Sequence, residues 1–266
     1  MNRVFLFILT IILSLGAHAE RVISMSPTIT EIIYELDQAD VLVGVSSFCL
    51  YPKMACSKPN VGTALTPDLE SILKLKPTRI YSQKMENSAL SKKASKLKLK
   101  VENLEFDSFE DIIESIEKLG RDLGATSKAK ELTIALEKGF SQLGDLDKKG
   151  SFLAVIDVVE KMGHVSRVLV AETDTFYSDL ISQIGMKNYV SGKGGYRSLT
   201  IEELLKKDLT FFLFSPKKSQ KAELLNTELK RFKKNEIKIY SFEENYAVIP
   251  GPRLILLIDD LIKVLK

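Results

Sequence analysis

The chain has 266 residues, of which 45% are hydrophobic and 27% charged, and its 38 basic and 35 acidic residues leave a formal net charge of +3. This composition is that of a globular protein and excludes a disordered, collagen-like or long coiled-coil chain. The balanced charge, without a basic stripe interleaved with aromatic side chains, argues against a nucleic-acid partner. Two cysteines exclude a disulfide scaffold and a four-thiolate metal site.

The first 20 residues are typical of an export signal. A positive start at Arg3, an apolar stretch over residues 4–15 and the small residues Ala17 and Ala19 together resemble a Sec-type signal peptide over residues 1–19. The apolar stretch is shorter than the roughly 20 residues that span a bilayer. We therefore expect cleavage after Ala19 and a mature protein in the periplasm. No cysteine follows the cleavage point directly, which argues against a lipid anchor.

Short β-branched runs alternate with helical patterns over residues 20–124. The patterns predict strands at residues 21–25, 41–45, 80–81 and 101–104, and helices at residues 27–36, 69–73 and 90–97. Strands that alternate with helices imply βαβ crossovers and hence a mostly parallel sheet. We expect these residues to form an N-terminal α/β lobe.

The pattern changes after residue 109 and is nearly all helical up to about residue 146, with a break at residues 124–126. Residues 125–148 are expected to contain one long connecting helix, on which Leu132, Leu136 and Phe140 recur at helical spacing. The alternation then resumes, and it predicts strands at residues 152–159, 211–214 and 237–242 and helices at residues 176–184, 201–205, 224–232 and 254–265. The sequence therefore predicts two α/β lobes, residues 20–124 and 149–266, joined by that helix.

The two halves contain similar short segments. Glu70 lies in a predicted helix that precedes a strand, and Glu202, 132 residues later, lies in a matching helix that also precedes a strand. The match places one carboxylate at the same point of each lobe. A coincidence between two short amphipathic helices is the alternative explanation.

Several motifs resemble those of the helical-backbone class of periplasmic substrate-binding proteins. In order, they are VISMSPTITE at residues 22–31, VGVSSFCLYP at 43–52, PNVG at 59–62, PDLESIL at 67–73, KP at 76–77 and GPR at 251–253. The resemblance covers essentially the whole mature chain and is more specific before Gly150 than after it. This class serves ABC importers of cobalamin, iron-siderophores and haem, and the chain looks most like its cobalamin-binding members.

The resemblance implies a binding protein that does no chemistry and holds neither a cofactor nor a resident metal. Its ligand, cobalamin or a related corrinoid, would lie between two lobes joined by a stiff helix. Its partners would be an ABC permease with its ATPase, and we expect a monomer. By position, Glu70 and Glu202 would dock on permease arginines, one from each lobe. The alternative is that both are solvated glutamates near a helix N-terminus.

The resemblance also places candidate ligand contacts, because large corrinoids are held mainly by flat aromatic surfaces. Phe48 occupies the family's tyrosine position after the second strand, and Tyr196 falls where the cobalamin binders have a tryptophan. Tyr246 lies in a late loop that lines their pocket, and Tyr51 is near Phe48. Two further tryptophan positions are Ala64 and Gln83 here, and the chain has no tryptophan. Ordinary packing is the alternative for each aromatic residue.

Other ligands of the same class stay open. Haem carriers of this class ligate iron through a tyrosine just after the Val-Gly pair, but Thr63 follows Val61-Gly62 here. His164, the one histidine outside the signal peptide, is expected to be a surface residue. Arg197, beside Tyr196, would suit an anionic iron-siderophore.

Cys49 and Cys56 enclose a short loop beside the predicted pocket. In an oxidising compartment they could form a disulfide, which would stabilise the fold by about 2–3 kcal/mol at most. Two free thiols are the alternative.

The motifs give little support to the hypothesis that the protein is an enzyme. The chain has neither a G-x-S-x-G elbow nor an H-E-x-x-H metal motif, which argues against a secreted esterase or metal-dependent hydrolase. Residues 192–195, GKGG, lack the Lys-Ser/Thr ending of a phosphate-binding loop, and we expect a flexible turn there. A structural or signalling module that reuses the fold is a third reading, because fold alone does not fix function.

Overall fold

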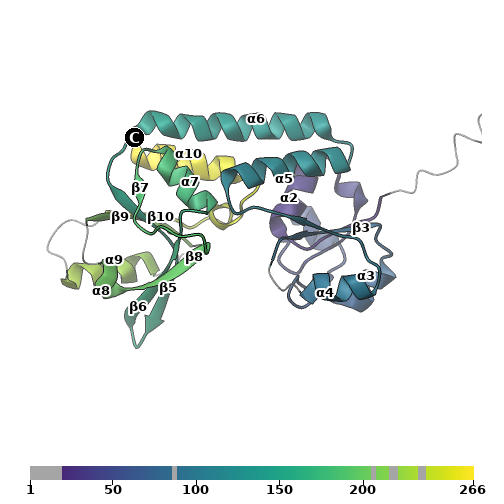
Figure 1. Ribbon diagram of the computed structural model, residues 1–266, viewed down its shortest axis with the longest axis horizontal. Coiled ribbons are helices and arrows are strands. Elements are labelled where there is room, and N and C mark those ends of the chain that lie inside the picture. The colour runs from purple at the N-terminus through teal and green to yellow at the C-terminus, as the bar shows by residue number, and fades with distance from the viewer. Residues whose placement is uncertain (1–19, 86–88, 205–207, 216–220, 233–237) are drawn as a thin grey trace, which may run out of the picture.

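The computed structural model describes residues 20–85, 89–204, 208–215, 221–232 and 238–266. The expected signal peptide and its cleavage point lie outside these residues. The described residues form two α/β lobes below a layer of long helices (Figure 1). This arrangement confirms the predicted fold class. Within the described ranges, no helix is long and apolar enough to cross a membrane.

The N-terminal lobe contains a parallel four-stranded sheet in the order β2-β1-β3-β4. Its strands are β1 (Val22–Ser24), β2 (Leu42–Val45), β3 (Arg79–Gln83) and β4 (Val101–Leu104), and its helices are α2 (Pro27–Glu35), α3 (Leu69–Lys74) and α4 (Ala89–Lys96). Because all four strands are parallel, the loops that follow them leave from the same edge of the sheet. In open α/β sheets this carboxyl edge is where ligands bind.

The C-terminal lobe contains a mixed sheet in the order β10-β9-β5-β6-β8, with β7 paired to β5. Its strands are β5 (Ser151–Lys161), β6 (His164–Ala171), β7 (Lys187–Asn188), β8 (Tyr196–Thr200), β9 (Leu209–Phe214) and β10 (Lys238–Phe242). Helices α8 (Ile201–Leu204) and α9 (Lys221–Phe232) complete the lower part of the lobe (Figure 1).

Strands β6 and β8 were not predicted, and they make this sheet less parallel than expected. The β5–β6 hairpin turns at Met162-Gly163, both with positive φ, and β8 pairs antiparallel with β6. The buried Val165, Val168 and Val170 show why β6 forms, since they place apolar side chains against the sheet core. A Lys-Met-Gly-His sequence lacks the Asn-Gly or Asp-Gly signal that usually reveals such a hairpin.

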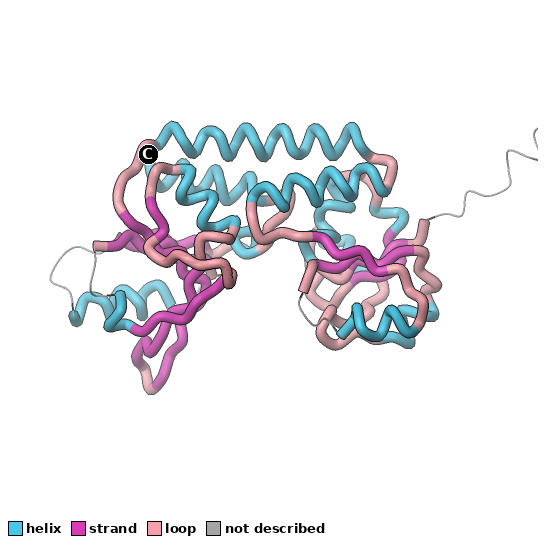
Figure 2. Tube along the Cα trace, in the orientation of Figure 1, coloured by secondary structure: helices cyan, strands magenta, loops and turns pink. Residues whose placement is uncertain are grey.

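A layer of four helices joins the lobes: α5 (Phe109–Asp122), α6 (Thr126–Leu143), α7 (Phe176–Gln183) and α10 (Leu254–Leu265). Helix α6 lies within the predicted connecting segment, and its 18 residues span about 27 Å. It passes over both lobes, with α5 and α10 directly below it and the strands of both lobes further down (Figure 2). The two lobes are therefore connected by a layer of packed helices and not by one helix alone.

The N-terminus of α5 is fixed by a capping box. The Ser108 hydroxyl accepts a hydrogen bond from the Asp111 backbone N–H at 3.1 Å, and the Asp111 carboxylate accepts one from the Ser108 N–H at 2.9 Å. The chain then turns from α5 into α6 at Gly124, whose φ of +71° suits glycine. These local signals set where the helical layer begins and reverses.

One hydrophobic core extends through both lobes. It includes Val22 and Leu104 in the N-terminal lobe, Leu136 in α6, and Phe212 and Phe214 in the C-terminal lobe. Two smaller cores fill the opposite faces of the two sheets. Because the largest core is shared, the lobes and the helical layer pack as one body.

The crossing of α5 and α6 requires glycine at position 120. A Cβ at Gly120 would lie closer than 3.0 Å to the Ala129 Cβ. The alanine side chain is too short to move aside by itself, so the backbone of one helix would have to shift. We expect Gly120→Ala to lower the free energy of unfolding by about 1–3 kcal/mol, as overpacking does. Urea denaturation measures the effect. Gly144→Ala is the control, because its nearest neighbour, the Gln183 amide, is at the end of a flexible side chain; equal losses for both variants would contradict the close crossing.

Candidate functional site

The loop after β2 presents two aromatic side chains at the carboxyl edge of the N-terminal sheet. Phe48 is 66% exposed and Tyr51 is 44% exposed. The base of the loop is held by the Ser46 N–H, which donates to the Ser24 carbonyl at 2.9 Å, and by the Cys49 N–H, which donates to the Ser46 carbonyl at 3.1 Å. Large apolar side chains so exposed on an anchored loop are typical of a binding surface.

A pocket of about 310 Å³ lies beside this loop and has walls from both halves of the chain. Its lining is mainly apolar. The N-terminal lobe contributes Pro27, Glu31, Phe48, Leu50 and Tyr51, and the C-terminal half contributes Asn245, Val248, Ile249 and Arg253. The pocket is therefore formed only when the two halves meet.

The two charged residues of the pocket pair across the lobes. The Arg253 guanidinium donates to both carboxylate oxygens of Glu31, at 2.6 and 2.8 Å, and the Glu31 side chain is only 1% exposed. Arg253 also lies over the Tyr51 ring, with its Cζ 4.0 Å from the ring centroid. Burial lowers the pKa of Arg253, but the hydrogen bonds and charge of the Glu31 carboxylate more than offset this, so the net shift in the pKa of Arg253 is upward. The pair ties α10 to α2 and supports Tyr51.

Tyr196 and Arg197 are the first two residues of β8, and they are not among the residues that line this pocket. Strand β8 starts on the side of the C-terminal lobe that faces the other lobe and runs down to α8 (Figure 1). Tyr196 is half-exposed, and burial of part of its ring, together with Asp107 and Asp174, raises the pKa of its hydroxyl. The Arg197 guanidinium is 2.6 Å from the carboxylate of Glu172.

The structure turns Tyr246 toward α10 and not into the pocket. Its hydroxyl donates to the Asp260 carboxylate at 2.5 Å, and its ring packs on the main core. Burial and this hydrogen bond raise the pKa of Tyr246 to about 12. The neighbouring Asn245 lines the pocket in its place.

Of the two alternatives for Cys49 and Cys56, a disulfide or two free thiols, the structure has two free thiols. The buried Cys49 thiol lies 3.1 Å from the Thr30 hydroxyl and 3.2 Å from the Ser46 hydroxyl, and its burial raises the pKa of the thiol. Cys56 is exposed, and its thiol points to the Leu50 carbonyl. The two side chains thus face different surroundings.

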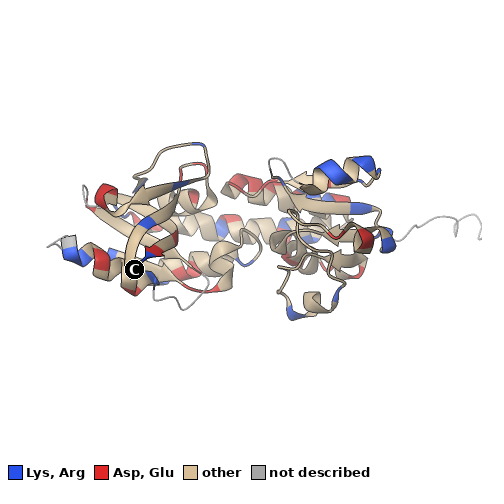
Figure 3. Cartoon of the chain, turned by 90° about the horizontal axis from the view of Figure 1, so that it is seen from below, with Lys and Arg blue, Asp and Glu red and all other residues tan. Residues whose placement is uncertain are grey.

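Glu70 and Glu202 are both exposed, on α3 and α8. These helices lie on the side of their lobes that faces away from α6 (Figure 1). Glu70 forms an exposed ion pair with Lys74 at 2.6 Å, one turn along the same helix. In the view from below, basic and acidic residues are interspersed along the chain in both lobes (Figure 3).

His164 lies at the start of β6, away from the aromatic residues. Its Nδ1 atom is 2.7 Å from the Arg231 guanidinium and 3.3 Å from the Glu228 carboxylate. These contacts hold the hairpin to α9. They agree with the expectation that His164 is a surface residue.

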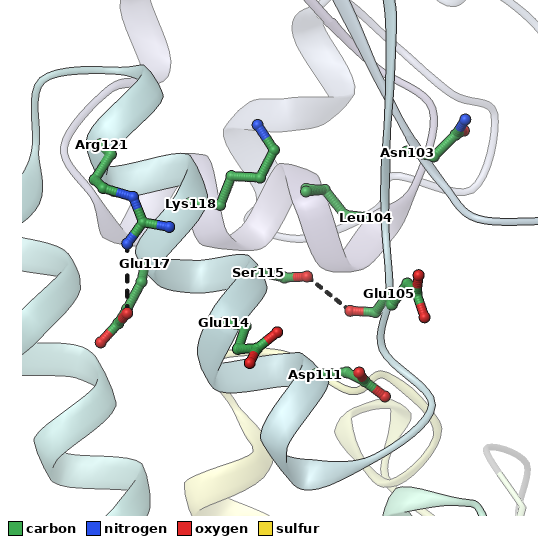
Figure 4. Close-up of a pocket in the computed structure, with 9 residues that line it drawn as sticks. All are labelled: Asn103, Leu104, Glu105, Asp111, Glu114, Ser115, Glu117, Lys118 and Arg121. Atoms are coloured by element: carbon green, nitrogen blue, oxygen red, sulfur yellow. Dashed lines mark hydrogen bonds and ion pairs between the residues drawn. The ribbon is translucent and has the colours of Figure 1, made fainter.

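A second pocket, of about 440 Å³, lies on the N-terminal lobe between β4 and α5 (Figure 4). Its side chains are mostly charged, and Arg121 forms an ion pair with Glu117 at 3.4 Å. The Ser115 hydroxyl donates to the backbone carbonyl of Glu105 at 2.7 Å. It has neither the aromatic lining nor the contribution from both lobes of the first pocket. The first pocket is therefore the candidate ligand site.

Sequence reasoning missed several pocket residues. Glu31 and Arg253 lay in motifs that carried the resemblance, but nothing in the sequence showed that residues 222 positions apart would pair. Leu50 could have been found, because it lies between the predicted contacts Phe48 and Tyr51. Val248 and Ile249 follow the last strand, where the carboxyl-edge rule would have placed them.

Comparison with known proteins decides the family. A family model described as periplasmic binding protein matches residues 22–237. The chain belongs to this family.

Among curated proteins, the chain is 25% identical over 248 residues to the uncharacterised ABC transporter substrate-binding lipoprotein YvrC of Bacillus subtilis, with 89% of this chain and 76% of YvrC covered. It is 27% identical over 214 residues to the high-affinity heme uptake system protein IsdE of Staphylococcus aureus, with 79% of this chain and 72% of IsdE covered.

Among solved structures, the periplasmic vitamin B12 binding protein BtuF of Vibrio cholerae superposes with a TM-score of 0.72 at 22% identity, over 93% of this chain and 96% of BtuF. The fold is therefore that of the substrate-binding proteins. The chain is a substrate-binding protein of an ABC transporter and not an enzyme.

The Glu31–Arg253 pair should be important for stability. Arg253→Met leaves a buried carboxylate without a partner, and we expect it to lower the free energy of unfolding by about 3–5 kcal/mol. Adding Glu31→Gln should restore much of the loss, because no buried charge then remains. Chemical denaturation of both variants tests this. Arg121→Met, which breaks an exposed pair, should cost less than about 1 kcal/mol; an equally small loss for Arg253→Met would overturn the argument.

Proposed function

We propose that this protein binds cobalamin, or a related corrinoid, outside the cytoplasm and delivers it to an ABC permease. The observation that carries the proposal is the aromatic pocket between the lobes, lined by Phe48 and Tyr51 and closed on the other side by residues 245–253. An apolar pocket with few polar groups suits a large ligand that is bound by desolvation of its flat faces. The signal peptide over residues 1–19 would export the chain to the periplasm.

The charges in the pocket and those around Tyr196 favour a ligand without net negative charge. Arg253 is paired with Glu31 and Arg197 with Glu172, so both guanidinium groups are already neutralised by buried carboxylates. Asp107 and Asp174 lie near Tyr196 and add negative charge. A cobalamin is neutral or cationic, whereas haem brings two carboxylates and ferric siderophores are commonly anionic.

Haem is the second candidate ligand. The phenol groups of Tyr51 and Tyr196 are both partly exposed, and a tyrosine oxygen can ligate haem iron. The similarity to a heme uptake protein also supports it. The two ligands make different demands on the site, because only haem would need a phenolate and a cation for its carboxylates.

Delivery would use Glu70 and Glu202. Both carboxylates are exposed, and their helices lie on the same side of the molecule, one on each lobe. Arginines of a permease could pair with each carboxylate and so fix the orientation of both lobes at once. The exposed Lys74 next to Glu70 is a weak competitor, because a solvated pair contributes little energy.

Calorimetry of the mature chain tests which ligand the protein binds. We expect hydroxocobalamin to bind and Phe48→Ala to weaken binding about 10- to 100-fold, because the ring contributes roughly 1.5–3 kcal/mol when it is covered. Met162→Ala, which removes an exposed apolar side chain at the hairpin tip, is the control and should leave affinity unchanged. The ligand would instead be haem if haemin binds and hydroxocobalamin does not, and if Tyr51→Phe or Tyr196→Phe abolishes the Soret shift of bound haemin.

Docking is tested by removing both carboxylates. We expect Glu70→Ala with Glu202→Ala to leave ligand affinity intact and to abolish uptake in cells that depend on this importer. The matched control is Glu131→Ala with Glu137→Ala, which removes two exposed carboxylates from α6, on the opposite side. A loss of affinity in the first double variant, or equal uptake by both, would count against docking through these residues.

A further inference from the structure

The glycine-rich segment at residues 192–195 is not a free turn in the structure. The Gly194 N–H donates to the Glu172 carboxylate at 2.8 Å, and the Gly195 N–H donates to the Asp174 carboxylate at 3.1 Å. The Thr173 hydroxyl donates to the Gly192 carbonyl at 2.8 Å. The segment is thus folded onto residues 172–174, the loop that follows β6.

Lack of space for a side chain explains Gly192 and Gly194. A Cβ at Gly192 would lie closer than 3.0 Å to three atoms of the Glu172 carboxyl group, and one at Gly194 would lie 3.1 Å from its Oε2. The Glu172 side chain is only 5% exposed, so it has little room to move away. Glycine fits best at both positions because the backbone passes beside a buried carboxylate, and the approach is closest at Gly192.

The same carboxylate holds the residues on both sides of Tyr196. It binds Gly194 before the tyrosine and the Arg197 guanidinium, at 2.6 Å, after it. The Glu172 N–H also donates to the Gly195 carbonyl at 2.9 Å, and Tyr196 pairs with Ala171 in the β6–β8 ladder. The half-exposed ring of Tyr196 is therefore carried by a backbone that is fixed at several points.

The loop that contains Glu172 is also attached to the other lobe. The Thr175 hydroxyl donates to the Glu172 carbonyl at 2.9 Å, and the next residue, Phe176, donates its N–H to the carbonyl of Asp107. One turn into α7, the Asp179 carboxylate accepts the Phe109 N–H at 2.8 Å. Asp107 and Phe109 belong to the segment that leads from β4 into α5, so Tyr196 is fixed relative to both lobes.

We propose that Glu172 is a positioning residue for ligand binding: it clamps the 192–195 segment and Arg197 so that the Tyr196 ring is presented in a fixed orientation to the ligand. This inference rests on the proposed function and on the expectation, taken from the family resemblance, that Tyr196 contacts the ligand. A ring that is already ordered loses less conformational entropy when ligand covers it, and the gain from such preorganisation is about 3- to 10-fold in affinity.

A fluorescent reporter tests the clamp without any ligand. Because the chain has no tryptophan, Tyr196→Trp introduces a single one at the position in question. In the chain that carries only this change, we expect high fluorescence anisotropy and weak quenching by acrylamide. Adding Glu172→Gln, which weakens the ion pair with Arg197, should lower the anisotropy and increase the quenching. Adding Glu160→Gln, which neutralises an exposed carboxylate on β5, should change neither.

If Glu172→Gln does not fold, as judged by its thermal unfolding, Gly194→Ala provides a milder change, because its Cβ only presses on the carboxylate. Reporter signals that are unchanged in the folded variant would overturn the proposal.

Ligand affinity supplies the second readout. With whichever of hydroxocobalamin or haemin binds the unchanged chain, Glu172→Gln should weaken binding about 3- to 10-fold, and it should have no such effect in a Tyr196→Ala background. A purely structural role of Glu172 would weaken binding equally in both backgrounds and would overturn the proposal. If neither compound binds the unchanged chain, the proposed function fails, while the fluorescent reporter still decides whether the clamp exists.

Discussion

Two buried carboxylates, each paired with an arginine, determine how the aromatic side chains between the lobes are held. A carboxylate that loses water must find a cation and hydrogen-bond donors, because an unpaired buried charge is strongly destabilising. Glu31 meets this need with Arg253, which lies over the Tyr51 ring. Glu172 meets it with Arg197 and the Gly194 N–H, on either side of Tyr196. In both cases the pairing fixes an arginine that supports or adjoins an exposed aromatic ring.

The pairing also makes binding a property of the whole molecule. Glu31 belongs to α2 and Arg253 precedes α10, so that one ion pair joins the N-terminal lobe to the end of the chain. The shared core below α6 adds apolar contacts to the same connection. A pocket built from both halves in this way keeps its shape without ligand, and this lowers the entropy cost of binding.

The sequence was most informative where local patterns decide structure. The parallel N-terminal lobe, the long helices and the aromatic loop at Phe48 follow from periodicity, turn residues and the family motifs. Strands β6 and β8 were missed because β6 forms by pairing with β5 and β8 by pairing with β6, and no local sequence signal reveals either pairing. The state of Cys49 and Cys56 stayed open because spacing alone does not show that the Cys49 thiol is directed to Thr30 and Ser46.

The polar contacts of the site were the least predictable part. Glu31 and Arg253 are 222 residues apart, and residues 192–195 looked like a flexible turn until the position of Glu172 explained Gly192 and Gly194. Tyr246 was expected in the pocket, but a hydrogen bond to Asp260 fixes it on α10. In each case the deciding partner lies on a different element, so that only the folded chain reveals it.

Crystal structures of the mature chain grown with hydroxocobalamin and, separately, with haemin test the central claim most directly. The account predicts one bound ligand between the lobes, in contact with Phe48 and Tyr51 from the N-terminal lobe and with Tyr196 from the C-terminal lobe. A ligand that touches one lobe alone, or that occupies the polar pocket between β4 and α5, would contradict it.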